Sequence, residues 1–295
     1  MAITINTNLQ SMIVQKNLSK ATNQLNSAIE RMTTGYKINH ASDNAAGYSI
    51  ARNWEAQLGS LDVAADNAAT GADMLATLED NYALISSHVQ RVRDLTEQAS
   101  NGTYGVQSKN AIQAEIQARL DEIDRIAANC EFNGIDLMKG GDTEGTPATA
   151  GIDIQVGIDG VAGNSRIHLD SEIFADGSVE GLFTAAGAEE LAKKCAGLDT
   201  TTGNSAQEQL AKIDTVINAI SNRITKLGAA QNRIESAIES IGVQSENITS
   251  SLSTLRDADV ATESSNYIKA QILQQASATL LSTANQSPSI ALNLL

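Results

Sequence analysis

The sequence predicts a mainly α-helical protein, an elongated antiparallel coiled-coil bundle built from both chain ends, with a small β-hairpin region in the middle. Between Leu210 and Leu255, apolar residues recur every three or four positions and form one narrow seam, which has to be buried against another helix. Aromatic residues make up only 3% of the 295 residues. That composition suits thin helix–helix contacts better than the rounder core of a compact enzyme.

The first predicted helix carries one apolar seam and ends at Thr34–Gly35, since glycine commonly terminates helices. Its seam residues are spaced alternately four and three apart: Val14, Leu18, Ala21, Leu25, Ala28 and Met32. A linker follows, in which Ser42 or Asp43 can cap the next helix through a side-chain oxygen.

A second, long helix is predicted to reach about Thr96, and its alanine-rich middle makes it the natural mate of the 210–255 helix. The break at Asn101–Gly102 then reverses the chain into a shorter helix over about 106–129.

The middle of the chain, from Phe132 to about Asn204, is rich in glycine and loses the helical period. Alternating apolar residues on both sides of a glycine-rich turn predict a β-hairpin within about 150–170. A short helix is also expected near Ala188 to Cys195.

The chain returns to helix near its end. The stripe of this last helix comprises Ile268, Ile272, Leu273, Ala276, Leu280, Leu281 and Ala284. An apolar tail follows, with Leu292, Leu294 and Leu295, and such a tail requires a partner surface. We therefore expect the two chain ends to pair, which gives two stacked coiled-coil segments with both termini at one pole.

Composition argues against several classes of partner. The net charge of −15, without a Lys/Arg run, disfavours nucleic acid and anionic membranes. No apolar run approaches the ~18 residues of a membrane span. The N-terminus lacks a secretory signal, which by itself indicates a cytoplasmic protein, although a dedicated export route for an uncleaved chain would look the same. Cys130 and Cys195 lack a metal-ligand pattern and are expected to be free thiols, with their pairing left open.

No catalytic pattern is present. The three histidines, His40, His88 and His168, belong to no HExxH motif, and the chain has no GxGxxG, phosphate loop or GxSxG. We expect no enzyme activity, no cofactor and no metal.

Specific motifs at both ends resemble those of bacterial flagellins. At the front they are RMTTGYKINHASDNAAGYSIA (31–51) and QRVRDLTEQASNGT (90–103), and at the back ATESSNYIKAQILQQASATLLSTANQ (261–286). The chain departs from the family pattern at Asn44, where a second Asp is common, at Met32-Thr33, and in having two cysteines.

The resemblance implies a structural subunit that polymerises into the secreted, extracellular flagellar filament for motility. It implies that residues 1–42 and 256–295 form a terminal helical coiled-coil domain that lines the filament core, and that residues 43–255 form an outer helical domain with the β-hairpin. It implies self-association, and an export chaperone, filament cap and hook-junction proteins as partners. Only about 35 residues, 171–205, are available for outer domains, so a short form without them is expected. The alternatives are a hook–filament junction protein of the same architecture and a soluble coiled-coil scaffold; the intact QILQQA and ANQ runs favour flagellin.

The resemblance also implies two sets of site residues. Contacts between subunits in the core are assigned to Val14, Leu18, Leu25, Met32, Ile268, Ile272, Leu273, Leu280, Leu281, Leu292, Leu294 and Leu295. The alternative is that these seams serve only an intramolecular coiled coil. The face read by Toll-like receptor 5 in similar flagellins matches Gln90, Arg91, Leu95, Gln98, Ile112, Glu115 and Arg119, whose polar members could equally serve contacts between subunits. A cytosolic flagellin sensor is a further implied partner of the terminal leucines.

Overall fold

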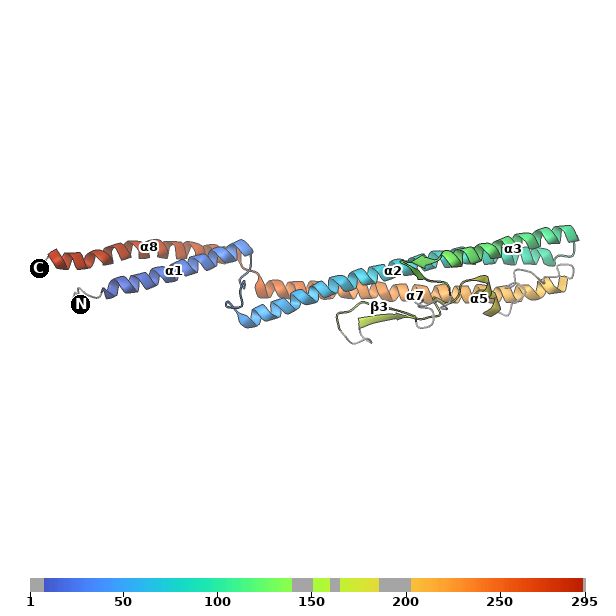
Figure 1. The fold of residues 1–295 in the computed structure, drawn as a ribbon, viewed down its shortest axis with the longest axis horizontal. Helices are drawn as coiled ribbons and strands as arrows, with labels where there is room; N and C mark the ends of the chain where they lie inside the picture. The colour runs from blue at the N-terminus through green and yellow to red at the C-terminus, as the bar shows by residue number, and fades with distance from the viewer. Residues whose placement is uncertain (1–7, 140–150, 160–164, 186–202, 294–295) are drawn as a thin grey trace. The chain divides into compact units, whose positions relative to one another are not determined.

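The computed structural model describes residues 8–139, 151–159, 165–185 and 203–293 (Figure 1). These residues form six α-helices and two two-stranded antiparallel sheets, so the expected fold class is confirmed. The chain divides into two units. The terminal unit is Met1–Leu58 with Ser245–Leu295, and the inner unit, named for its place between these two segments in the sequence, is Gly59–Gln244. This division falls inside the two longest helices. The domain boundaries expected at 42/43 and 255/256 follow helix ends instead and stay a prediction.

The terminal unit is dominated by α1 (Leu9–Thr34) and α8 (Val260–Asn293), which pack side by side and antiparallel (Figure 1). Asn8 caps α1, because its side chain accepts a hydrogen bond from the Ser11 N–H at 3.1 Å. Gly35 ends the helix at φ 76°, a left-handed conformation that favours glycine, and its N–H donates to the Arg31 carbonyl. The first predicted helix and its glycine stop are confirmed.

The long second helix, α2 (Ala45–Ser100), is confirmed, but its expected cap is wrong. The capping residue is Asn44, whose Oδ1 accepts the Gly47 N–H at 3.0 Å. Ser42 and Asp43 lie too early in the sequence, because the helix begins only at Ala45.

The inner unit is built around α2, α3 (Val106–Asn129) and α7 (Gly203–Arg256). Figure 1 shows α2 running antiparallel to both of the others. The expected third helix and the long returning helix are therefore confirmed. One continuous apolar cluster joins these helices to the middle of the chain. Its largest fully buried side chains are Tyr82, Phe174, Phe183, Leu75, Leu78, Ile85, Leu95, Leu120, Ile123, Leu137 and Met138.

The expected hairpin is present as β3 (Ile152–Gln155) and β4 (Arg166–Leu169), with Ile154 opposite Ile167. The hairpin packs on α2 at Gly71. A Cβ added there would lie 2.4 Å from Ile154 Cδ1, so the absence of a side chain lets the strand approach the helix.

Three short elements were not expected from the sequence. β1 (Glu131–Phe132) and β2 (Ile135–Asp136) form a second hairpin, joined by Asn133–Gly134, which both have positive φ, 50° and 81°. A short helix, α5 (Val179–Ala185), follows the β3–β4 hairpin. The helix expected near Ala188 to Cys195 lies outside the described residues.

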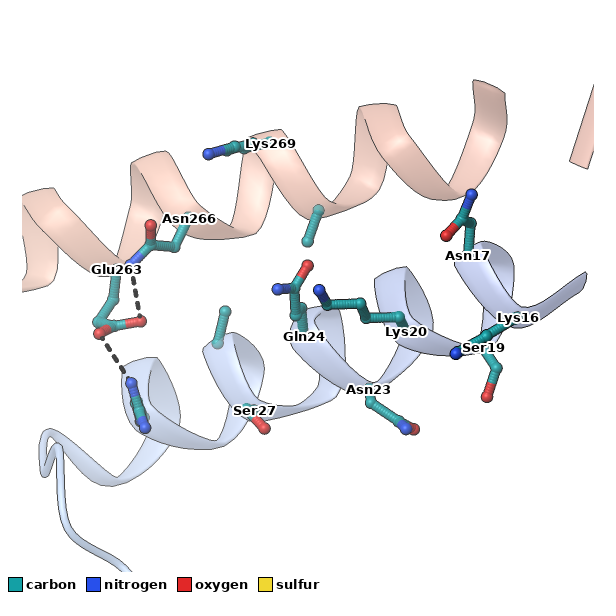
Figure 2. Close-up of a pocket in the computed structure, with 13 residues that line it drawn as sticks. Lys16, Asn17, Ser19, Lys20, Asn23, Gln24, Ser27, Glu263, Asn266 and Lys269 are labelled. Atoms are coloured by element: carbon teal, nitrogen blue, oxygen red, sulfur yellow. Dashed lines mark hydrogen bonds and ion pairs between the residues drawn. The ribbon is translucent and has the colours of Figure 1, made fainter. Parts of the chain in front are cut away.

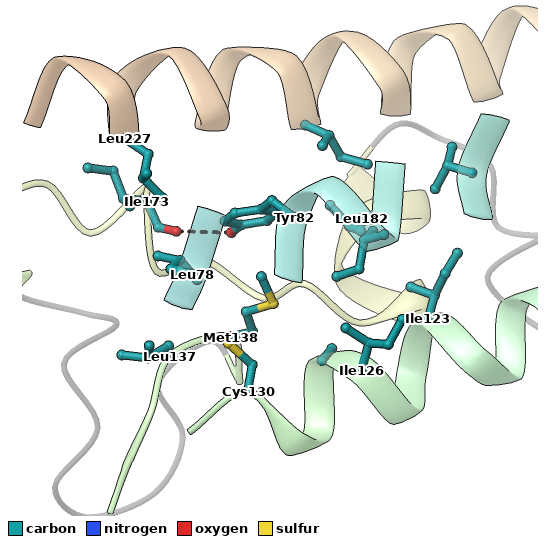
Figure 3. Close-up of a cluster of buried hydrophobic side chains, with 14 of the residues drawn as sticks. Leu78, Tyr82, Ile123, Ile126, Cys130, Leu137, Met138, Ile173, Leu182 and Leu227 are labelled. Carbon is teal, nitrogen blue, oxygen red and sulfur yellow. Dashed lines mark hydrogen bonds between the residues drawn. The ribbon is translucent and has the colours of Figure 1, made fainter. Parts of the chain in front are cut away.

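Tyr82 and Arg223 hold the segment before α5 against the long helices. The buried Tyr82 hydroxyl donates to the Ile173 carbonyl at 2.9 Å (Figure 3). The Arg223 guanidinium donates to the carbonyls of Ala175 at 3.1 Å and Asp176 at 2.9 Å. These bonds satisfy irregular backbone that would otherwise be left unpaired beside the core.

Candidate functional site: the paired terminal helices

The buried seam between α1 and α8 consists of small side chains. On α8, Ala270, Ser277 and Ala284 recur every seven residues and are at most 9% exposed. On α1, Ala21 and Ala28 are 3% exposed. Small residues let two helices approach closely, but they remove little apolar area from water. The pair is thus joined by a narrow contact.

Polar side chains set the alignment of the two helices. Gln274 Nε2 donates to Thr22 Oγ1 at 3.2 Å, and Ser11 Oγ donates to Asn285 Oδ1 at 2.7 Å. A one-step slip of either helix would separate each of these partners. Polar contacts within a coiled-coil seam commonly fix its register at some cost in stability.

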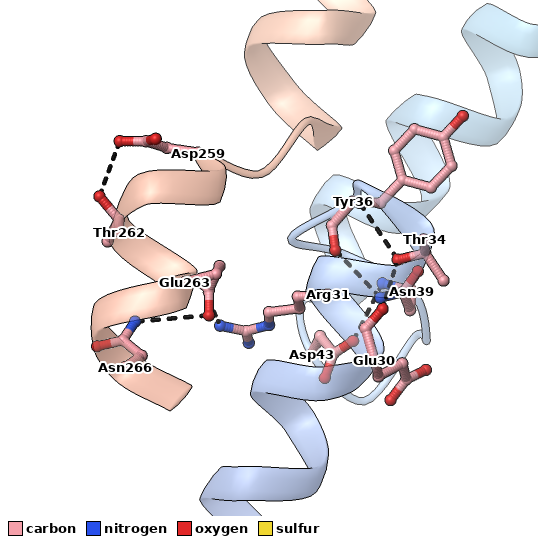
Figure 4. A network of polar contacts seen from close by, with 10 residues as sticks. All are labelled: Glu30, Arg31, Thr34, Tyr36, Asn39, Asp43, Asp259, Thr262, Glu263 and Asn266. Carbon is pink, nitrogen blue, oxygen red and sulfur yellow. Dashed lines mark hydrogen bonds and ion pairs between the residues drawn. The ribbon is translucent and has the colours of Figure 1, made fainter. Parts of the chain in front are cut away.

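Glu263 makes a further contact between α1 and α8. Its carboxylate lies 3.4 Å from the Arg31 guanidinium and accepts a longer bond, 3.5 Å, from the Asn266 side chain (Figure 4). Glu263 is 8% exposed, so its charge needs a partner, and Arg31 supplies one across the seam.

The stripe expected on α8 does not lie on one face of the helix. Leu281 is half-buried and Ala284 is buried toward α1. The other large members are exposed by 42–60%: Ile268, Ile272, Leu273 and Leu280. The seam toward α1 instead uses small and polar residues, which sequence periodicity did not separate from the rest.

The seam expected on α1 lies closer to the observed one. Val14, Leu18 and Leu25 are half-buried, while Met32 is 37% exposed at the end of the helix. A second group of α1 side chains, missed by the sequence analysis, is exposed by 43–66%: Leu9, Met12, Ile13 and Ile29. Their signal was that they are large and apolar yet fall outside the seam spacing. Leu292 lies in α8 without a described side chain, and Leu294 and Leu295 lie outside the described residues.

The linker after α1 is tied to the end of α7. The Lys37 N–H donates to the Arg256 carbonyl at 2.7 Å, and the Ala258 N–H donates to the Gly35 carbonyl at 2.8 Å. The Arg256 guanidinium also lies 4.1 Å from the centre of the Tyr36 ring. The two chain segments therefore leave their helices as a bonded pair.

Asp43 organises the loop inside this linker. Its carboxylate accepts the backbone N–H groups of His40 at 3.0 Å and Asn39 at 3.1 Å. The bond from His40 is the main cause that lowers the Asp43 pKa below its ordinary 3.8, because it stabilises the charged form. The Asn39 side chain in turn donates to the Tyr36 carbonyl (Figure 4).

The residues matching the receptor face lie on α2 and α3 of the inner unit. Leu95 and Ile112 are buried, 1% and 8% exposed, and belong to the core. The remaining five lie at the surface: Gln90, Arg91, Gln98, Glu115 and Arg119. Arg91 pairs with Glu115 at 3.0 Å, and Arg119 lies 3.9 Å from the same carboxylate.

Cys130 lies between α3 and β1 and is 2% exposed. Burial raises the pKa of this free thiol to about 11, so it stays protonated and unreactive at neutral pH. Cys195 lies outside the described residues. In the described part of the chain no three His, Cys, Asp or Glu side chains gather into a metal-binding group. None of the helices described here is both long and apolar enough to cross a membrane.

Both ends of the chain match known family models. Residues 5–143 match the bacterial flagellin N-terminal helical region, and residues 210–295 match the bacterial flagellin C-terminal helical region. The chain belongs to the bacterial flagellin family. As a flagellin, it is a structural subunit of the flagellar filament, which assembles from copies of one chain.

Similar flagellins align with this chain along its whole length. It is 37% identical to a flagellin of Xenorhabdus nematophila over 323 residues and 38% identical to flagellin 1 of Proteus mirabilis over 370 residues, with 100% of both chains covered in each comparison. A flagellin of Listeria innocua is 32% identical, with 99% of each chain covered. Among solved structures, a Vibrio parahaemolyticus protein assigned as flagellar hook-associated aligns with TM-score 0.59 at 14% identity, covering 73% of this chain and 100% of that one. The last likeness concerns the fold alone.

Proposed function

We propose that the outward apolar side chains of α1 and α8 are the contacts between subunits that build the core of the filament. One observation supports this most directly: Ile272 and Leu280 on α8, and Leu9 and Met12 on α1, are 57–66% exposed in the single chain. Large apolar groups clustered on two neighbouring helices are the surface that association would remove from water.

Copies of this chain would join through unlike surfaces. A contact between two different faces repeats along a helix when the rotation between subunits does not close a ring. The intramolecular seam uses the small residues of α8, which leaves its large apolar residues available for such contacts. Leu292, Leu294 and Leu295 belong to the same proposal through their position at the end of α8 and just beyond it.

The test is filament growth by an I272S/L280S variant. Each buried side chain should contribute about 1.5–3 kcal/mol, so we expect the critical concentration for growth to rise at least about a hundredfold. The monomer should keep its stability within about 0.5 kcal/mol, because both side chains are already in water there. Sedimentation and electron microscopy measure the first effect, and urea unfolding measures the second.

A matched control is the variant L84S/V243S. Leu84 and Val243 are exposed by 52% and 55% on helices of the inner unit. This variant should still grow filaments near the wild-type critical concentration. Unimpaired growth of I272S/L280S would exclude the proposed contacts.

Export and termination of the filament complete the proposal. We infer that the chain leaves the cell by the flagellar export route and meets an export chaperone, a filament cap and hook-junction proteins. The rival reading is a hook–filament junction protein of the same architecture. Long filaments from the purified chain alone, seen by electron microscopy, support the filament subunit, and failure to form them favours the junction protein.

A second role concerns the free monomer. We propose that the exposed cluster of Arg91, Glu115 and Arg119 is read by Toll-like receptor 5. The cluster offers two guanidinium groups around one carboxylate, with Leu95 and Ile112 fixing the helices beneath it. Recognition of the apolar tail by a cytosolic sensor is proposed on the resemblance alone.

The receptor proposal is tested in a cell reporter assay. The variant R91A/E115A should lose at least about tenfold in potency, because truncating a charged pair at the centre of an interface is costly. The variant E122A/R125A removes a similar exposed pair on α3 and should signal normally. Equal potency of the two variants would exclude the receptor face, and loss of filament growth by R91A/E115A would favour a role in subunit contacts.

We infer no catalytic activity. The family is structural, and the histidines of this chain stand in no catalytic sequence motif.

A further inference from the structure

A polar groove runs along the α1–α8 pair of the terminal unit and encloses about 850 Å³ (Figure 2). Lys16 and Lys20 border it from α1, and Lys269 borders it from α8. Its other charged residues, Arg31 and Glu263, pair with each other at 3.4 Å. The groove therefore keeps an excess of three positive charges.

The three lysines of the groove have no ion-pair partner among the residues the structure describes. Lys16 and Lys20 are also one turn apart on α1, where like charges repel and weaken the helix slightly. No Asp or Glu occurs in residues 1–29 to offset them. All three lysines are exposed, so water solvates them in the single chain and they are accessible to a counter-charge on a second chain.

The net negative charge of this protein comes from the inner unit. The terminal unit contains seven Lys or Arg and seven Asp or Glu, whereas the inner unit contains 13 and 28. The whole net charge of −15 therefore belongs to the inner unit. A second copy of the chain brings a strongly anionic partner to each terminal unit.

Within the inner unit, one face of α2 carries a row of carboxylates. Asp62, Asp66, Asp73 and Asp80 are exposed and, at the helical repeat, fall within about 40° of one line along the helix. None of the four makes an ion pair with another described residue. The row is thus as free of counter-charges as the groove.

The axial spacing of the three groove lysines is close to that of the aspartates on α2. The contacts Arg31–Glu263 and Thr22–Gln274 align Lys269 with residues 25–27 of α1. Lys269 therefore lies about six residues beyond Lys20, which lies four residues beyond Lys16. At 1.5 Å per residue, the axial steps are about 6 Å and about 9 Å.

The acidic row has nearly the same steps. From Asp62 to Asp66 is four residues, and from Asp66 to Asp73 is seven, or about 6 Å and about 10 Å along the helix. The order of the steps agrees when α2 of the partner runs parallel to α1. Lysine side chains are flexible enough to absorb the remaining difference.

We propose that the lysine groove of one subunit receives the acidic face of α2 from a second copy, with α2 parallel to α1. The pairs formed are Lys16 with Asp62, Lys20 with Asp66, and Lys269 with Asp73. This inference rests on the proposed filament and adds a specific charged contact to it. Because every copy carries both surfaces at different places, the contact is heterologous and suits an open helical polymer. The attraction also orients an arriving subunit before its apolar surfaces meet.

The first experiment uses the unaltered chain. Filaments grown from an equal mixture of ¹⁴N- and ¹⁵N-labelled subunits are treated with a carbodiimide, which joins a lysine amine to a carboxylate in direct contact. Mass spectrometry should find Lys20 joined to Asp66 in mixed-label peptides, and the monomer should not give them. Filaments that yield no mixed-label link between these two rows would overturn the proposal.

The second experiment exchanges the charges. At low salt, where charge pairs are least screened, K16E/K20E and D62K/D66K should each raise the critical concentration for growth from wild-type seeds at least about tenfold. The chain carrying all four substitutions should return to within about threefold of wild type, because opposite charges again face each other.

A control tests whether filament growth is restored by the position of the new lysines or only by the change in net charge. Glu235 and Glu239 are exposed and one turn apart on α7, so E235K/E239K changes the net charge by the same amount as D62K/D66K. Added to K16E/K20E, it should not restore growth. Equal rescue by both pairs, or loss of growth without rescue by D62K/D66K, would overturn the proposal and assign the groove to another acidic partner.

The experiments distinguish a failure of the proposed filament from a failure of the proposed groove contact. If the wild-type chain forms no filaments, the proposed function is wrong. If it does, and K16E/K20E grows as well as wild type, the groove assignment alone is wrong. Circular dichroism of each variant shows whether its helices are intact.

Discussion

The two units of this protein use similar helices but bury very different side chains. In the inner unit, Tyr82, Leu120 and Phe183 are completely buried. In the terminal unit, the α1–α8 seam buries mainly alanines, and Ile272 on the same pair is 60% exposed. A large apolar side chain contributes about 1.5–3 kcal/mol on burial, and an alanine contributes much less. The inner unit therefore completes a core of large side chains within one chain, while the helix pair of the terminal unit leaves many of its large apolar side chains in water.

This difference assigns the units separate tasks. A unit whose core is complete can keep its shape before and after assembly. A pair of helices held by a narrow seam and a few polar contacts has low local stability, and such regions open most easily. The following predictions test that contrast, beginning with the largest expected effect.

Truncating the inner core should cost most. Leu120→Ala should lower the free energy of unfolding of the monomer by about 2–5 kcal/mol, since it leaves a cavity among α2, α3 and α7. Urea unfolding followed by circular dichroism measures the change. The matched change Ile272→Ala on α8 should alter monomer stability by less than about 0.5 kcal/mol. Equal losses from both variants would remove the contrast between the units.

Removing the hydrogen bonds that Arg223 donates to the segment before α5 should have the next largest effect. Arg223→Met keeps an unbranched apolar stem but leaves the Ala175 and Asp176 carbonyls without their charged donor, which should cost about 1–3 kcal/mol in the same unfolding measurement. Arg233→Met, at an exposed position on α7, is the control and should be nearly neutral. A neutral Arg223→Met would mean that water replaces the guanidinium.

The same contrast explains what could be predicted from the sequence. The seam of α1 was recognised at Val14, Leu18 and Leu25 because large apolar residues mark it at regular spacing. The seam of α8 was not recognised, because Ala270 and Ser277 face α1 while larger residues face outward. Hydrophobic periodicity identifies the face with the strongest apolar signal, and in a polymer subunit that face need not be the one buried inside the chain.

The short elements were not predicted from the sequence, for a different reason. α5 and the β1–β2 hairpin are too short to show a period, and they are held by contacts from distant residues, as when Asp124 accepts the Val179 N–H. Asn133–Gly134 was the one local signal for the hairpin, and it was read only as a turn. The cap of α2 was assigned one or two residues early, since several capping residues adjoin in Ser42, Asp43 and Asn44.

Weakening the polar alignment of the terminal helices should have a small effect on the monomer. Glu263→Gln removes the ion pair with Arg31, which is one-third exposed, so the cost should be about 0–1 kcal/mol. Amide hydrogen exchange should speed up along α1 and α8 and stay unchanged in α3. Glu246→Gln, at an exposed position on α7, is the control. Faster exchange in α3 would show that the two units do not open independently.

The smallest expected effect concerns pH and the linker loop. Because Asp43 has a lowered pKa, its bonds to the N–H groups of His40 and Asn39 are complete above the ordinary value of 3.8 and are lost as pH falls through the lower folded value. In a nuclear magnetic resonance titration, both amide signals should shift with a midpoint below 3.8, and Asp43→Asn should abolish the shift. Asp62→Asn, at an exposed position on α2, should leave the titration of both amide signals unchanged. A midpoint at or above 3.8 would mean that the loop does not stabilise the charged carboxylate.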